Sequence, residues 1–119
     1  MATNELVAYP LAENLTVPSG TVSGDPLLIG ASLVGVAETT RDANGKATVH
    51  YGPTVRTINV KGIDGSGNSA VAIGDKLYIT MADSPPVSKK ATGVFFGKAL
   101  GVVTSGSTTA IAVYVFNGS

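Results

Sequence analysis

Glycine and proline are spread along the whole chain, and their spacing constrains the fold more than any other feature. Of the 119 residues, 15 are Gly and 6 are Pro, and both residue types disfavour the interior of a helix. The apolar residues between them are mostly Val, Ile, Leu and Tyr in short blocks, which is typical of strands. We therefore expect an all-β fold without a long helix.

Three segments alternate between apolar and other residues with a period of two, which predicts strands. In TAIAVYVF (residues 109–116), Ile111, Val113 and Val115 share one face. The segments TVRTINVKG (residues 54–62) and ATVHY (residues 47–51) alternate in the same way. Short strands at intervals of about ten residues predict a small antiparallel β-barrel or sandwich.

The segments between these strands carry turn signals. Asn44-Gly45 is expected to supply positive φ angles for a tight hairpin. Residues 62–70 and 81–93 are expected to form two long loops. The second contains Pro85-Pro86, which cannot lie in a central strand because neither residue has an amide hydrogen to donate.

One short sequence motif occurs twice in the chain. Gly24-Asp25 and Gly74-Asp75 each precede an apolar segment, where a Gly-Asp turn would redirect the chain. Gly35 and Gly101 are expected inside apolar strands, where a missing side chain permits a bulge or a bend. Because 11 positions separate the first pair of glycines and 27 the second, we expect two related half-barrels, with the proline loop inserted in the second.

The composition excludes several classes of partner. Eight Lys plus Arg balance eight Asp plus Glu, so no net field attracts nucleic acid or an anionic membrane. No secretory signal is expected at the N-terminus, and the run AIAVYVF is far too short to span a membrane. Only 13% of the residues are charged and 44% are hydrophobic, which favours burial of some apolar surface against other chains.

Residues that could carry chemistry are few. There is no cysteine, so neither a disulfide nor a thiolate metal site is possible. His50 lies in an alternating segment without a partner at a telling spacing, and we expect a surface or barrel-wall histidine. Residues 64–68 resemble the start of a calcium loop but lack its closing acidic residue. We expect no enzyme activity, no cofactor and no metal.

The order of several motifs along the chain resembles a known family. The motifs are Ser23-Gly24-Asp25, Val34-Gly35-Val36-Ala37, Gly74-Asp75-Lys76-Leu77-Tyr78, Leu100-Gly101-Val102 and the closing segment of residues 109–115. Together they resemble the capsid decoration, or cement, proteins of tailed phages, a group formerly listed as a domain of unknown function. Some members carry a recombinase label, which the absence of a phosphate loop does not support here.

This resemblance implies a small all-β structural protein of the virion. Such a protein binds the outer surface of an icosahedral phage head, commonly as a homotrimer, and stabilises contacts between major capsid subunits against the pressure of packaged DNA. The implied partners are the major capsid protein and further copies of itself, with neither nucleic acid nor membrane. The implied location is the exterior of the capsid, after assembly in the host cytoplasm.

The first residues depart from the resemblance and are the candidates for partner binding. We divide the chain into an N-terminal arm, residues 1–12, and a single β domain, residues 13–119. The candidate contact residues are Leu6, Val7, Tyr9, Pro10 and Leu11. The arm is either a frayed edge strand of the barrel or a segment that adds a strand to a capsid subunit or to a sister protomer.

Two other classes of function stay open from the sequence. One is another virion β module, such as a head-fibre base, a tail component or a carbohydrate-binding domain. The chain has no Trp and its Tyr residues are dispersed, which disfavours a sugar site. The other is a small β-barrel enzyme, which the thin catalytic inventory disfavours.

Overall fold

The computed structural model describes residues 12–117, and this part of the chain contains eleven strands and no helix. The strands are β1 (Ala12–Thr16), β2 (Pro26–Ile29), β3 (Leu33–Ala37), β4 (Lys46–His50), β5 (Thr54–Lys61), β6 (Ile63–Asp64), β7 (Gly67–Asn68), β8 (Lys76–Ile79), β9 (Val87–Ser88), β10 (Val94–Ala99) and β11 (Thr108–Val115). The expectation of an all-β fold is confirmed.

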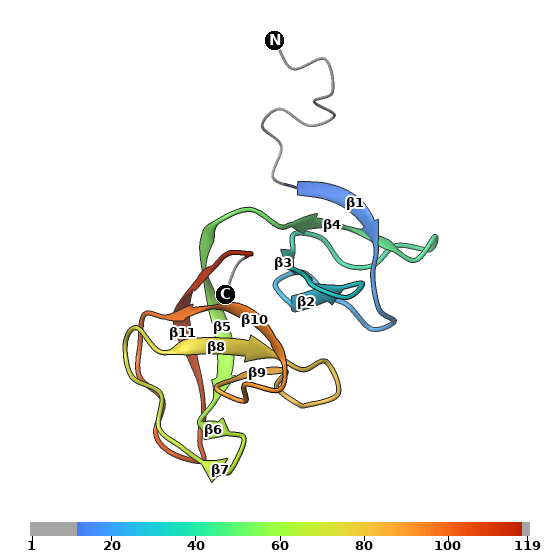
Figure 1. Cartoon of the computed structure of the whole chain (residues 1–119). Helices are drawn as coiled ribbons and strands as arrows, with labels where there is room; N and C mark the ends of the chain where they lie inside the picture. The colour runs from blue at the N-terminus through green and yellow to red at the C-terminus, as the bar shows by residue number, and fades with distance from the viewer. Residues whose placement is uncertain (1–11, 118–119) are drawn as a thin grey trace.

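The strands form an open sheet and a closed barrel (Figure 1). The open sheet has the order β1-β4-β3-β2 and is antiparallel throughout, and the barrel has the order β10-β11-β5-β9-β8. Within the barrel only β5 and β9 run parallel, through two residue pairs. The β6–β7 hairpin lies at the end of the barrel that is distant from the open sheet (Figure 1).

The predicted alternation fixes which side chains face the barrel core. On β11, Ile111, Val113 and Val115 are buried, whereas Ala112 and Tyr114 are exposed. On β5, the buried positions are Ile58 and Val60, and the exposed ones are Val55, Thr57 and Asn59. Since β5 and β11 pair along their full length, they form one continuous wall with an apolar inner face and a solvent-facing outer face.

The two Gly-Asp turns have the same geometry. The Asp25 carboxylate accepts a hydrogen bond from the amide N–H of Val22 (2.9 Å), and the Asp75 carboxylate accepts one from the amide N–H of Ala72 (2.8 Å). Gly24 and Gly74 have φ angles of +93° and +91°, which favour glycine. The prediction that both Asp residues shape turns is confirmed.

The match between the two copies continues beyond the turns. The amide N–H of Gly24 donates to the carbonyl of Ala37, and that of Gly74 to the carbonyl of Ala99, both at 2.7 Å. The chain therefore contains the same strand pair twice, as β2–β3 and as β8–β10.

The neighbouring strands correspond as well. Ala37 pairs with Val49 on β4, and Ala99 pairs with Val113 on β11. On their other sides, β4 pairs with β1 and β11 pairs with β5. The chain is thus two tandem copies of one four-stranded unit: β1, β2, β3 and β4 form the first half, and β5, β8, β10 and β11 form the second.

The expected counterpart of Gly35 is wrong. Gly35 pairs with Leu27 and Gly97 pairs with Leu77, so Gly97 is the counterpart, while Gly101 lies in a bend after β10. The residue after the glycine is the buried Val36 in the first half and the exposed Lys98 in the second. An apolar residue after the glycine is therefore not shared by the two halves, and the similarity of Val34-Gly35-Val36 to Leu100-Gly101-Val102 does not reflect equivalent positions.

The insertion predicted in the second half is confirmed. Residues 30–32 connect β2 to β3, whereas residues 80–93 connect β8 to β10 and contain β9. Pro85 and Pro86 precede β9, as their missing amide hydrogens require. A second insertion is the β6–β7 hairpin, so residues 62–70 form a short hairpin where a plain loop was expected.

The expected tight turn at Asn44-Gly45 is confirmed, although of these two residues only Gly45 has a positive φ angle (+79°). The amide of Gly45 donates to the carbonyl of Asp42 (3.1 Å), and the amide of Asp42 donates to the carbonyl of Lys46 (2.8 Å), which closes the turn between β3 and β4. Asp42 Oδ1 also accepts hydrogen bonds from the amides of Asn44 (2.8 Å) and Lys46 (3.0 Å). The bond from Lys46 is the main cause that lowers the pKa of Asp42.

The two halves are joined by core packing, an ion pair and side-chain hydrogen bonds. Val34 and Val36 of β3 belong to the barrel's hydrophobic core. Arg56 of β5 forms an ion pair with Glu38 (2.6 Å). The side-chain amide of Asn117 donates to the carbonyls of Val34 (3.1 Å) and Tyr51 (2.8 Å), which ties the end of the described chain to the first half.

The close approach of β10 to β11 generates a stability prediction. A Cβ at Gly97 would collide with the backbone carbonyl of Tyr114, whereas a Cβ at Gly65 meets nothing within 4 Å. Because backbone cannot easily yield, Gly97→Ala is expected to lower the free energy of unfolding by about 3 kcal/mol, and Gly65→Ala by no more than about 0.5 kcal/mol. Urea unfolding followed by circular dichroism measures both, and equal stabilities would contradict the assigned register.

Candidate interaction surfaces

The residues that resemble the start of a calcium loop, residues 64–68, form a hydrogen-bonded turn. Asp64 Oδ1 accepts hydrogen bonds from the amides of Ser66 (2.7 Å) and Gly67 (3.1 Å), so it closes the β6–β7 turn. The bond from Ser66 is the main cause that lowers the pKa of Asp64. Among residues 12–117, no three His, Cys, Asp or Glu side chains are grouped so that they could hold a metal ion.

His50 lies on β4 and is partly buried. Within the described residues its Nδ1 atom has no hydrogen-bond partner. It pairs across the sheet with Val36 and Ala12, neither of which can act as a nucleophile or metal ligand. The histidine is therefore a partly buried residue of the open sheet, whereas a surface or barrel-wall position was expected.

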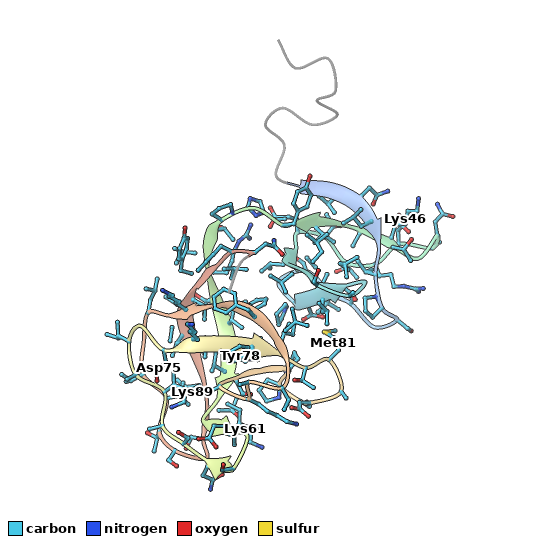
Figure 2. The ribbon with its side chains drawn as sticks, in the orientation of Figure 1. Lys46, Lys61, Asp75, Tyr78, Met81 and Lys89 are labelled. Atoms are coloured by element: carbon cyan, nitrogen blue, oxygen red, sulfur yellow. The ribbon has the colours of Figure 1, made fainter. Side chains whose placement is uncertain are left out.

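The basic pair Lys89-Lys90 is held by local partners. The Lys89 ammonium donates to the carbonyl of Ala70 (2.8 Å) and lies 3.5 Å from the carboxylate of Asp75, beside which it appears in Figure 2. Lys90 lies 3.3 Å from the carboxylate of Asp83. Both charges are compensated, so the pair does not present a basic patch to a polyanion.

A hollow of about 420 Å³ lies between the two halves. Its walls are the Gly24-Asp25-Pro26 turn and the Ser84-Pro85-Pro86 loop, and its floor is formed by residues of β5 and β11. Asp25 is the titratable residue of the lining, and its carboxylate already accepts the bond from Val22.

The sequence-predicted partner-binding residues, Leu6, Val7, Tyr9, Pro10 and Leu11, lie outside the described residues. The described chain begins with β1, which pairs with β4 on one side and is the edge strand of the open sheet. The predicted role of these five residues stays a prediction.

Large apolar side chains are exposed mainly on the barrel. Of the seven described residues of this kind, five lie there: Val55 (57% exposed), Ile73 (68%), Leu100 (44%), Val102 (64%) and Tyr114 (38%). The other two, Val22 and Met81, lie in the first half and in the proline loop, respectively.

These five side chains and Ala112 adjoin one another, and we call them the apolar strip. Tyr114 pairs directly with Val55 across β11 and β5. The amide N–H of Leu100 donates to the carbonyl of Ala112 (2.9 Å), two positions along β11 from Tyr114. Val71 and Val103 form an isolated bridge, which brings the segments that carry Ile73 and Val102 together.

Aromatic contacts fix one end of the strip. The ring centroids of Tyr114 and Phe116 are 4.7 Å apart, and those of Phe116 and Phe95 are 5.1 Å apart. The Phe95 ring in turn packs edge-on against that of Tyr78, with 6.1 Å between the centroids. Because Phe95 is buried, this row of rings anchors the exposed Tyr114 to the barrel.

Sequence reasoning did not identify the apolar strip. Its members come from four separate segments, and each is an ordinary strand or turn residue in isolation. Only the strand register places them together, and an apolar run such as Leu100-Gly101-Val102 reads equally well as a buried strand.

No helix long and apolar enough to cross a membrane occurs in the part of the chain that the structure describes. No curated protein and no solved structure matches the chain. The model of one protein family, described as phage cement protein, matches residues 11–115. This match runs from the residue before β1 to the end of β11, so it includes both halves of the repeat. Because it covers nearly the whole chain, the protein belongs to the phage cement protein family.

Proposed function

We propose that the protein decorates the outer surface of an icosahedral phage head and stabilises contacts between major capsid subunits. The observation that carries the proposal is the family match over residues 11–115, since a phage cement protein is a structural component of the virion capsid. The proposal adds assembly in the host cytoplasm, the major capsid protein as the partner, and a homotrimer as the unit that binds.

The physical character of the molecule supports a structural role. Its carboxylates at Asp25, Asp42, Asp64 and Asp75 bond to nearby backbone amides and shape turns. A clamp on a shell needs a stiff scaffold and many weak contacts, because copies on a symmetric surface add their contributions. A closed barrel joined to a second sheet by shared core residues provides such stiffness.

We further propose that residues 1–12 act as an arm that extends from the β domain of residues 13–119. In this proposal Leu6, Val7, Tyr9, Pro10 and Leu11 contact a capsid subunit or a sister protomer by strand addition, a mode in which backbone hydrogen bonds supply affinity. Its support is the position of β1, which begins at the last residue of the arm and lies at the edge of the open sheet.

Removal of residues 1–11 tests the arm and leaves β1 whole. The shortened protein is expected to keep its circular dichroism spectrum and thermal midpoint but to bind purified undecorated heads at least about tenfold more weakly. Removal of residues 1–4 alone is the matched control, because it keeps all five candidate residues and should bind normally. Co-sedimentation with heads measures both, and undiminished binding of the 1–11 deletion would refute the arm.

The copy number in purified virions tests the class of structural role. Quantitative mass spectrometry is expected to give a number of copies comparable to that of the major capsid protein, because a decoration protein repeats with the shell lattice. A handful of copies per virion would instead favour a head-fibre base or a tail component.

A further inference from the structure

We propose that the apolar strip on the barrel is the surface through which copies of this chain associate with one another. The strip is made of side chains from the turn before β8, the segment after β10, the exposed positions of β11 and the start of β5. The inference deepens the proposed function, which includes self-association but does not name the face that makes it.

The first half of the chain serves as an internal control for the strip. The turn before β2 and the end of β3 repeat the hydrogen bonds of the turn before β8 and the end of β10. The correspondence continues into the next segment. There the backbone amide of Arg41 donates to the carbonyl of Thr21 (3.1 Å), just as the amide of Val103 donates to the carbonyl of Val71 (3.0 Å). Positions in the two halves can therefore be compared one by one.

At the equivalent positions the first half is polar. Ser23, Glu38 and Thr40 stand where the second half has Ile73, Leu100 and Val102. The amide of Ser23 donates to Oγ1 of Thr40 (3.2 Å), and its hydroxyl donates to the carbonyl of Glu38 (3.0 Å). These bonds also show that the three positions adjoin one another in this geometry.

The same contrast extends onto the last strand of each half. The backbone amide of Glu38 donates to the carbonyl of Thr48 (2.7 Å), just as the amide of Leu100 donates to the carbonyl of Ala112. Val36 pairs with His50 as Lys98 pairs with Tyr114. Thr48 and His50 therefore correspond to Ala112 and Tyr114, and the second half replaces five polar residues by apolar ones.

The fold does not require these apolar residues, since the first half builds the same turn and strands without them. A side chain that is 44–68% exposed, as Leu100, Val102 and Ile73 are, contributes little to the core of its own chain. Exposed apolar side chains that are grouped together, rather than scattered singly, mark interaction sites on soluble proteins.

A second copy of the chain is the occupant that the strip fits best. Its six members carry no charge, and depletion of charge with aromatic enrichment is typical of the core of subunit interfaces. Lys98, which pairs with Tyr114, stands at its border. A cement protein must stay soluble until a shell exists, and association with its own copies covers the strip during that time.

The test transfers the residues of the first half into the second. The full-length triple variant Ile73→Ser, Leu100→Glu, Val102→Thr is compared with the unaltered chain by sedimentation velocity over a range of concentrations. The unaltered chain is expected to form oligomers, and the triple variant to be monomeric or at least about tenfold weaker in association. The matched control, Val22→Ser with Met81→Thr, removes the two exposed apolar residues that lie outside the strip and should associate normally.

Circular dichroism establishes that each variant is folded, and Leu100→Glu alone replaces the triple variant if the latter is not. An unaltered chain that is monomeric at every concentration, or a folded strip variant that associates normally, overturns the inference. Binding to undecorated heads separates the two proposals. A strip variant that keeps its oligomeric state but no longer binds heads would assign the strip to contact with the capsid, and the proposed function would stand. An unaltered chain that associates through the strip but does not bind heads would overturn the proposed function alone.

Discussion

The Gly-Asp turn is the constraint on which the rest of the structure depends. In each copy the aspartate carboxylate holds the turn closed. The glycine amide ties the turn to the carbonyl at the end of β3 in the first copy and at the end of β10 in the second. That bond sets the register of the strand pair, and the register decides which side chains face the core. Two copies of one turn thus specify two copies of a four-stranded unit.

The halves differ where residues have been inserted or replaced. In the second half, β9 pairs with β5 and β8 and closes the barrel, whereas the first half stays open with β1 and β2 at its edges. The second half also carries the apolar strip where the first is polar. Because the shared scaffold accounts for the shared residues, the differences are where we look for partners.

Local sequence signals predicted what depends on local structure. The all-β fold, the buried faces of β5 and β11, both aspartate turns and the inserted proline loop follow from periodicity and turn chemistry. The prediction that Gly101 corresponds to Gly35 in the second half was wrong. Val36 packs against the barrel core, whereas its counterpart Lys98 is exposed, and only the folded chain shows this difference. The strand β9 has two residues, too few for a periodic signal. The apolar strip was missed because its members meet only through long-range pairing.

The central claim is that this protein holds a phage head together from outside. The most direct test heats DNA-filled heads that lack the protein and follows genome release by the fluorescence of a DNA-binding dye, with and without purified protein added back. The account predicts that added protein raises the temperature of release and that the effect saturates when the sites on the shell are full. An identical release temperature in both samples, with the protein bound to the heads, would contradict it.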